Sequence, residues 1–324
     1  MFSHNFATRL VVSLFLSLCG LRLAAQSYNV ITFSVPDPPT KYTHGLGISD
    51  LGVVVGYYEI PHGTGVPYYR GFIRQADGTL QYPIIDPNDI GGNNTEPWAV
   101  NASVTVAGAY LTPDGRGHGF LLSGGNFTTV DEIAGGETVI LTLNDSGDYG
   151  GAFGPSWPPA NGFISIAGVV TQINVPGASA TSVTGLATDG SSVGTAEMSQ
   201  GFVGFLRGPS GSLHVFQVPK AVYGTYATAI NSETRLVVGY YYDSAGLARG
   251  FVYHYPHPLN ATGPDSPPSA GIVIEHPDVI TIDGSSGTGF TYPFGVNSSG
   301  VISGTWRGDR HRSHVYGFIA TPAQ

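Results

Sequence analysis

The chain has 324 residues, of which 41% are hydrophobic and only 11% charged, and its formal net charge is −9. This acidic balance argues against nucleic acid and anionic membrane surfaces as partners, because both require clustered lysine and arginine. Glycine, with 47 residues, is about twofold above its usual ~7% and recurs in register rather than in low-complexity tracts.

The first 25 residues are predicted to be a secretory signal peptide. An apolar run covers residues 10–21, and Leu-Ala-Ala at 23–25 provides a cleavage site. The run is shorter than the ~20 residues needed to cross a bilayer, so no membrane span is predicted. The single cysteine, Cys19, leaves with this segment, and the mature chain then has no disulfide and no thiol nucleophile. We expect one exported domain of residues 26–324, extracellular or periplasmic, with 11 basic and 22 acidic side chains.

The mature chain opens with a predicted strand at residues 28–33, Tyr-Asn-Val-Ile-Thr-Phe. After it, a Gly-Phe pair followed by an aliphatic residue recurs six times, at spacings of 48, 43, 42, 46 and 67 residues. A period in the forties indicates one supersecondary unit stacked on copies of itself, as in a solenoid or a propeller. We expect the six phenylalanines to be buried between units; they are Phe72, Phe120, Phe163, Phe205, Phe251 and Phe318.

Each unit begins with a strand, a turn rich in Asn, Asp, Ser and Gly, and a second strand that reaches a recurrent glycine. The six copies span residues 48–56, 100–108, 143–151, 186–194, 230–239 and 296–304. Asn, Asp and Ser bond their own backbone in tight turns, and Gly accepts positive φ, so each copy is predicted to be a hairpin. The fifth copy has one extra residue and hence a looser turn.

The Gly-Phe strand and the strand after it form a second predicted hairpin in each unit. The following strand is rich in Thr and Val, as at residues 127–131, 170–174 and 279–283. We label the four strands a to d in chain order; the a–b and c–d joins are tight, and the b–c join is variable. The d–a join is long enough to cross from one unit's rim to the next unit's centre. The sequence therefore predicts an all-β fold, a six-bladed propeller of four-stranded antiparallel blades.

The two ends of the mature chain are predicted to complete one blade together. Residues 28–33 form a d-type strand without a preceding c strand, and residues 316–319 form a c strand without a following d strand. Pairing them makes the sixth blade, closes the ring and removes strand edges that would invite aggregation.

The repeated signature resembles a known repeat family. Gly/Ala-Ile/Val-Asn-x-x-Gly, then apolar-Gly-x-Tyr and then Gly-Phe-Leu, is similar to the HAF-type probable extracellular repeat of secreted bacterial proteins, over residues 28–320. The fourth unit departs from it, since Leu-Ala at 186–187 and Ala-Glu at 196–197 replace the Asn and the Tyr. A Pro-rich stretch around 260–275 also enlarges the fifth c–d loop. The resemblance implies export and repetition and no particular reaction.

Motifs of catalysis are absent from the sequence. There is no Gly-x-Ser-x-Gly, no His-Glu-x-x-His and no phosphate-binding glycine loop, so we predict no catalytic residue, cofactor or metal. Residues 86–89 and 145–148 resemble parts of calcium loops, but neither supplies a full set of oxygen ligands, and turn chemistry accounts for both. Residues 299–306 resemble a sialidase box without its Asp.

Two short motifs near the C-terminus fall in the last b–c loop. Residues 307–309 are the Arg-Gly-Asp adhesion tripeptide, and residues 310–314 form the only dense cationic patch of an acidic chain. The patch suits an anionic ligand such as an acidic glycan, or it is an ordinary solvated loop.

We expect a monomeric, non-enzymatic binding or scaffolding protein whose ligand is a glycan or a protein. Alternating strand direction places the b–c loops and the d–a crossovers on one face of the propeller. The b–c loops vary most and carry aromatic side chains beside polar ones, which suits sugar rings or a protein partner, although a rim of ordinary tyrosines has the same composition. The candidate ligand contacts are Tyr68, Tyr69, Asp114, Arg116, His118, Trp157, Tyr241, Asp243, Trp306, Arg310 and His311.

The alternative function is a carbohydrate-active enzyme, hydrolase or lyase, that uses the same face. Such an enzyme needs two carboxylates ~5–9 Å apart. The candidates in the b–c loops are Asp114, Asp243 and Asp309.

Overall fold

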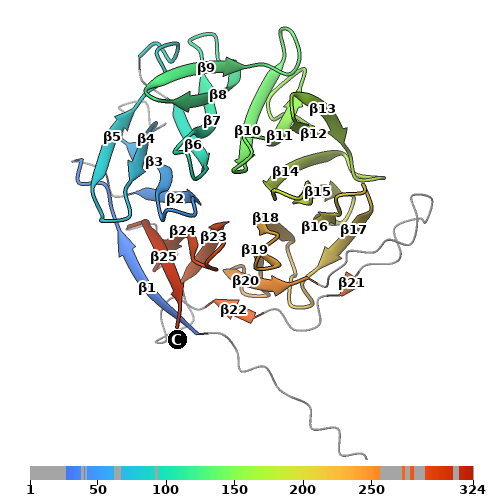
Figure 1. Ribbon diagram of the computed structural model, residues 1–324. Helices are drawn as coiled ribbons and strands as arrows, with labels where there is room; N and C mark the ends of the chain where they lie inside the picture. The colour runs from blue at the N-terminus through green and yellow to red at the C-terminus, as the bar shows by residue number, and fades with distance from the viewer. Residues whose placement is uncertain are drawn as a thin grey trace, which may run out of the picture.

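The computed structural model describes residues 27–37, 40, 42–61, 67–91, 94–255, 272–273, 278–280, 289–308 and 314–323. They form six sheets, each built on four antiparallel strands and arranged in a ring, which Figure 1 shows along the channel. Strands of one sheet run side by side from the centre to the rim, so the fold is the predicted six-bladed β-propeller. Among the described residues no helix is long and apolar enough to cross a bilayer.

Within a blade the strands follow one another outward from the central channel. Blade 1 comprises β2 (Thr43–Ile48), β3 (Val54–Ile60), β4 (Tyr68–Arg74) and β5 (Leu80–Ile84). Blade 2 comprises β6 (Thr95–Val100), β7 (Val106–Leu111), β8 (Gly117–Ser123) and β9 (Asn126–Val130). Blade 3 comprises β10 (Glu137–Leu143), β11 (Tyr149–Gly154), β12 (Asn161–Ile166) and β13 (Val169–Ile173).

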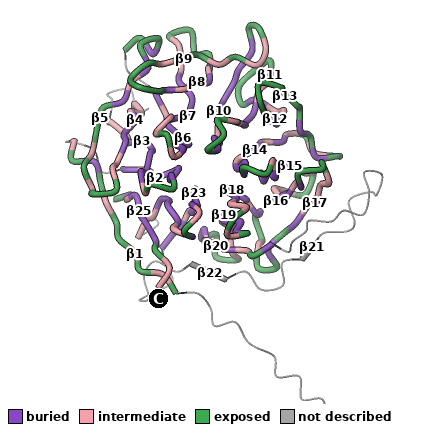
Figure 2. Tube along the Cα trace, in the orientation of Figure 1, coloured by how far each residue is buried: buried purple, intermediate pink, exposed green. Residues whose placement is uncertain are grey.

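The other three blades follow the same order. Blade 4 comprises β14 (Ala180–Leu186), β15 (Ser192–Met198), β16 (Gly201–Arg207) and β17 (Leu213–Gln217). Blade 5 comprises β18 (Thr225–Asn231), β19 (Leu236–Tyr242), β20 (Ala248–His254) and β22 (Asp278–Ile280). Blade 6 comprises β23 (Phe290–Val296), β24 (Ile302–Arg307), β25 (Tyr316–Pro322) and β1 (Tyr28–Phe33). Figure 2 shows that exposed residues gather on the rim strands, as on β13.

The ring is closed by the N-terminal strand, as predicted. β1 pairs antiparallel with β25 in a continuous register from Tyr28↔Pro322 to Phe33↔Gly317. Gly317 is required at this point, because a Cβ there would overlap the Phe33 ring.

One rim edge is extended by a strand that the sequence did not predict. β21 (Ile272–Val273), from the Pro-rich connection of blade 5, pairs in parallel with β17 of blade 4. The Pro-rich stretch therefore does more than enlarge a loop, since it adds a fifth strand to the neighbouring blade.

The Gly-Phe repeat is explained by packing inside and between blades. All six predicted phenylalanines are 0% exposed, which confirms the expectation that they are buried. Each ring lies against the recurrent glycine of strand b; a Cβ at Gly108, for example, would lie 2.8 Å from the Phe120 ring. In most units the glycine before the Phe also touches the next blade, as Gly119 does, where a Cβ would lie 2.9 Å from Ile140; at Gly204 a Cβ would instead meet the Phe216 ring of its own blade. Burying one such ring is worth ~3–5 kcal/mol, judged from Phe-to-Ala substitutions.

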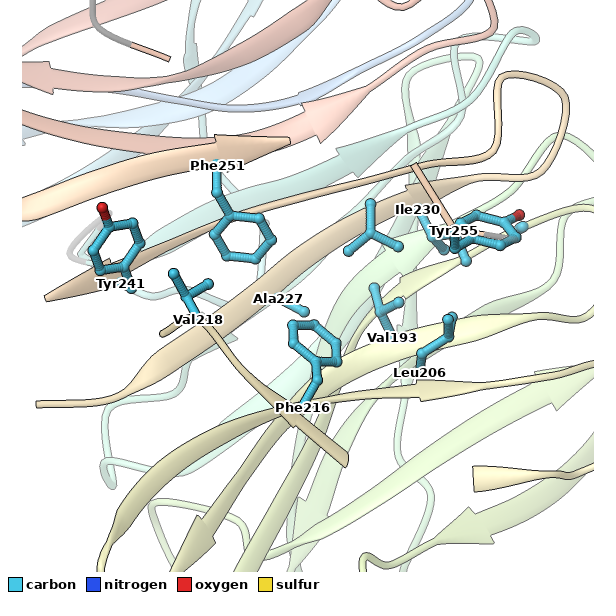
Figure 3. Close-up of a cluster of buried hydrophobic side chains, with 11 residues drawn as sticks. Val193, Leu206, Phe216, Val218, Ala227, Ile230, Tyr241, Phe251 and Tyr255 are labelled. Atoms are coloured by element: carbon cyan, nitrogen blue, oxygen red, sulfur yellow. The ribbon is translucent and has the colours of Figure 1, made fainter. Parts of the chain in front are cut away.

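Hydrophobic clusters join adjacent blades. In the cluster between blades 4 and 5, Phe216 packs edge-on against Phe251 with ring centroids 6.4 Å apart. Figure 3 shows aliphatic side chains such as Val193 and Ile230 filling the space beside these rings. Each blade is thereby held on both faces, which makes the ring one continuous packed body.

The recurrent Asn of the a–b turn also joins adjacent blades. Asn144 Oδ1 accepts the backbone N–H groups of Ser146 and Asp148, which closes its own turn as predicted. Its Nδ2 donates to Ala187 O in the next blade at 3.3 Å, and Asn101 Nδ2 donates to Asn144 O at 3.2 Å. Asn297 Nδ2 likewise reaches blade 1. The repeat position therefore has a second role beyond turn formation.

The looser fifth turn is visible in the backbone. In blade 3 the positive-φ residue, Gly147, lies three positions after Asn144, whereas in blade 5 it is Arg235, four positions after Asn231. One extra residue is present there, as the sequence indicated.

Candidate ligand-binding site

Each innermost strand carries one β-bulge, at the same height in all six blades. The register of the inner pair slips by one residue in every sheet. A bulge bends the strand and re-aims a side chain, and bulges are frequent beside binding sites. The residues at the bulges are Trp98, Leu141, Thr184, Thr228 and Phe294, with residues 46–47 in blade 1.

Five bulge residues line a cavity of about 300 Å³ in the central channel. The cavity lies on the b–c side of the bulges. Its other lining residues on the inner strands, such as Ser182 and Tyr226, come before the bulge, and each inner strand runs from the b–c face toward the a–b turn. The complete lining is Trp98, Leu141, Ser182, Thr184, Thr195, Tyr226, Ala227, Thr228, Tyr240 and Phe294. Of these described residues none is charged.

From the bulges toward the a–b turns the free space in the channel becomes smaller. The position after the bulge holds a small residue in most blades, because the next inner strand packs against it; a Cβ at Gly185 would lie 2.9 Å from Ala229 Cα. Only a space of about 70 Å³ is left at that level, and one of about 80 Å³ among the a–b turns. The cavity is therefore the widest of these three spaces in the channel, and it faces the predicted binding side.

Aromatic rings form a connected wall around this cavity. Tyr226 and Tyr240, paired across β18 and β19, stack with centroids 4.8 Å apart and planes 10° apart. Tyr240 also packs against Phe294 at 6.1 Å, and Phe294 against Trp98 at 6.2 Å. Burial, with the neighbouring Tyr242 phenol, raises the pKa of Tyr240 well above its ordinary value and that of Tyr226 to about 12. Both phenols are therefore neutral hydrogen-bonding groups at physiological pH.

The hydroxyl groups of the cavity divide into two kinds. Thr184 Oγ1 donates to Ala227 O at 2.7 Å and Thr228 Oγ1 donates to Pro293 O at 2.8 Å, so both tie adjacent blades together. Ser182 and Thr195 face each other across β14 and β15, and within the described chain neither hydroxyl has a hydrogen-bond partner. These two hydroxyls can pair with a ligand.

Glu96 lies next to the cavity without lining it. It is two residues before the bulge of β6, the position that Ser182 and Tyr226 hold in β14 and β18. Burial raises the pKa of Glu96 to about 7, against a smaller lowering by the neighbouring Trp98 indole.

Three predicted contacts gather above blades 2 and 3. Asp114 and Arg116 are exposed in the b–c loop of blade 2, with Arg116 Nε 3.5 Å from Asp114 Oδ2. Trp157, in the next b–c loop, is 55% exposed, and a Cβ at Gly117 would lie 2.8 Å from its ring. Hydrogen bonds, led by the one from Thr112, hold the pKa of Asp114 below its ordinary value.

His118 and Asp243 are held by local partners. His118 Nδ1 lies 2.9 Å from Asp131 Oδ1, and its ring stacks on Tyr110 at 5.3 Å. Asp243 Oδ2 accepts from Arg249 Nε at 2.9 Å, and Asp243 Oδ1 accepts backbone N–H groups of its own loop. Partial burial raises the pKa of Asp243, but the hydrogen bonds outweigh it and the pKa lies below the ordinary value. Asp243 therefore orders its own loop, and His118 joins β8 to the segment that follows β9.

Tyr68, Tyr69 and Trp306 lie in strands at the b–c side. The Tyr69 ring packs on Tyr57 at 5.2 Å, and Tyr57 lies 6.3 Å from Trp98, so an aromatic chain runs from Tyr69 to the cavity. Tyr68 is the first residue of β4 and is partly buried. Trp306, on β24, packs against Tyr316 at 5.8 Å.

Tyr241 is not a surface residue, and its interpretation as an exposed contact is wrong. It is 3% exposed and belongs to the cluster between blades 4 and 5 that Figure 3 shows. Side chains alternate along β19, so Tyr240 and Tyr242 face blade 6, where Tyr240 reaches the cavity. Asp309, Arg310 and His311 lie outside the described residues.

The comparisons with known proteins support the fold and no more. No protein-family model matches the chain, and no curated protein matches its sequence. Among solved structures, TolB from Acinetobacter baumannii is similar at a TM-score of 0.50 and 12% identity, over 85% of this chain and 65% of that one. This chain thus spans less than two thirds of the TolB chain. No group of three or more His, Cys, Asp or Glu side chains placed to hold a metal occurs in the described part of the chain.

The cavity residues escaped sequence reasoning. Bulges interrupt the alternation of inner strands, as in Trp98-Ala99-Val100, and such a break at the same place in each repeat is the available signal.

Proposed function

We propose that this protein is an exported HAF-type repeat protein that binds a glycan or protein ligand on its b–c face and catalyses no reaction. In this proposal residues 1–25 are a signal peptide and the mature monomer acts in the periplasm or outside the cell. The observation that carries the proposal is the 300 Å³ cavity, which repeated bulges build on this side of the channel. Concave sites with aromatic walls and few polar groups are the usual form of ligand pockets.

Exposed apolar side chains on the same face support a binding role. Ile90, Val222 and Tyr223 in d–a crossovers, and Trp157 in a b–c loop, are each more than half exposed. These connections belong to the b–c face, the side of the channel on which the cavity lies. Large apolar side chains left in water on one face are typical of interaction surfaces.

The enzyme alternative has less support. Asp114 and Asp243 belong to the b–c loops of blades 2 and 5, and each carboxylate lies beside an arginine. None of the residues that line the cavity carries a carboxyl group, and glycoside hydrolysis needs two close to one ligand.

A glycan array with the mature chain, residues 26–324, tests the proposal when it is read for both retention and cleavage. We expect retention without product, weakened at least tenfold by Trp157→Ala or Tyr223→Ala. Leu51→Ala is the matched control, because Leu51 is 59% exposed in an a–b turn on the opposite face. A pull-down with the same variants covers a protein ligand. Turnover that Asp114→Asn or Asp243→Asn abolishes would establish the enzyme instead.

A further inference from the structure

The channel cavity has the chemistry of a site for an uncharged ligand. No charged side chain is among the described residues that line it, and Glu96 lies next to it without lining it, so an ionised ligand group would lose its hydration without a counter-charge in the cavity wall. The Ser182 and Thr195 hydroxyls nevertheless need partners, and a wholly apolar ligand would leave them unpaired. The ligand must therefore be neutral and carry hydroxyl or amide groups.

The same ligand must also present an apolar face. Tyr226 and Tyr240 form a stacked pair on one side, and Trp98 and Phe294 form an edge-to-face pair that Tyr240 joins. Hydroxyl groups around the edge of a ring and C–H groups on its face are the combination found in a pyranose, which stacks on aromatic side chains through that face.

The volume fits one such ring. About 300 Å³ is at the small end of the ~300–1,000 Å³ typical of small-molecule pockets, which suits one ring of about twelve non-hydrogen atoms better than several. The next space along the channel, toward the a–b turns, is only about 70 Å³, which favours entry of the end of a chain from the b–c side.

We propose that the cavity binds one uncharged sugar ring, the terminal unit of a glycan, an inference that rests on the proposed binding role of this face. The ring stacks against the Tyr226 and Tyr240 side of the cavity and exchanges hydrogen bonds with Ser182 and Thr195. The rest of the glycan leaves toward Trp157 and Tyr223, the exposed aromatic residues of the b–c face. The phenylalanine side chain of a peptide is the competing occupant, and it gives these two hydroxyls no partner.

Fluorescence of a single tryptophan tests the inference. The chain has three tryptophans, so Trp157→Phe combined with Trp306→Phe leaves Trp98, in the cavity wall, as the only reporter. This variant is titrated with methyl glycosides of neutral hexoses, and with methyl glucuronide and methyl glucosaminide as charged analogues of similar size. We expect a saturable response to at least one neutral glycoside and at least tenfold weaker binding of the charged ones.

Two hydroxyl deletions locate the sugar. Ser182→Ala and Thr195→Val should each weaken binding about five- to tenfold, because each removes one hydrogen bond to the ligand. Thr171→Val, on the exposed rim strand β13, is the matched control and should change nothing. Thermal melting of each variant separates loss of binding from loss of the fold.

The possible failures differ from those of the proposed function. Glycan retention that Trp157→Ala abolishes, with no Trp98 response and no effect of Thr195→Val, would overturn the channel site and leave the binding face intact. Tighter binding of a charged glycoside, or no response to any neutral glycoside up to its solubility limit, would also overturn it.

Discussion

The Trp98 and Phe294 rings pack edge-to-face with centroids 6.2 Å apart, although they belong to blades 2 and 6 and blade 1 lies between them in the ring. The corresponding part of blade 1 contributes nothing to the cavity wall, and its Leu46 is 1% exposed. The cavity is therefore lopsided, walled by blades 2 to 6 and closed on the sixth side by two rings that reach across.

Phe294→Ala should open that side at a moderate cost. Phe294 is partly buried, so we expect a loss of about 1–3 kcal/mol, below the ~3–5 kcal/mol of a fully buried ring. Phe318→Ala, which removes a ring that is 0% exposed, is the comparison and should reach the higher range. Urea unfolding followed by tyrosine and tryptophan fluorescence measures both. Equal losses would mean that the Trp98–Phe294 contact is as tightly packed as the core.

Glu96 should make stability fall as the pH rises. Its pKa is raised in the folded protein from 4.5 to about 7, so the folded state holds the proton more tightly than the unfolded state. The contribution of this proton to the free energy of unfolding is fully present below about pH 4.5 and is lost as the pH rises through 7. At ~1.36 kcal/mol per pKa unit, Glu96→Gln should stabilise the protein by up to about 3 kcal/mol at pH 8 and by little at pH 4. Denaturant titrations across this range, with the exposed Glu233→Gln as control, would reject the idea if both variants follow the parent.

Asn144 should matter more than an ordinary turn residue. Asn144→Asp keeps the oxygen that closes the turn but loses the Nδ2 donor to Ala187 O, and it places a carboxylate near Asp148. With a buried carbonyl left unpaired, we expect a loss of about 1–3 kcal/mol. Asp189→Asn, in the exposed a–b turn of blade 4, is the control. A melting temperature that does not change in Asn144→Asp would show that the contact between blades contributes nothing.

Removal of β1 should open the ring. Deletion of residues 26–35 takes away the strand that pairs with β25, together with the Phe33 ring that lies over Gly317. The edge of β25 is then exposed, which favours association between copies. We expect a sharp fall in melting temperature relative to residues 26–324 and a shift to larger species in gel filtration. An unchanged melting curve would contradict the role of β1 in closure.

The repeat could be read from the sequence because its packing is local and periodic. Phe120 meets Gly108 in its own blade and Gly119 meets the next blade, so the same residues recur from unit to unit. The ligand cavity could not be read in this way. It depends on a register shift of one residue between the two innermost strands of each blade. This shift points Thr184 and Phe294 into the channel, and the amino-acid composition of the strands gives no sign of it.

Tyr241 illustrates the same limit on a smaller scale. Residues 240–242 are three identical tyrosines. Only the alternation of side chains along β19 determines that Tyr241 is buried while Tyr240 lines the cavity. The parallel pairing of β21 with β17 could not be predicted from the sequence either, because the two segments share no sequence pattern.

The backbone N–H of Ala323 donates to Ser27 O at 2.8 Å, where β1 and β25 meet. Residues 27 and 323 are thus adjacent at the end of the β1–β25 pair, and the ring is closed within a blade and not between blades. Joining the two ends with a few residues and cutting the two-residue turn between β15 and β16 should leave all inter-strand pairs intact. A circular permutant of this kind would carry the same cavity on a chain that starts at residue 200, with the former ends sealed into one continuous hairpin.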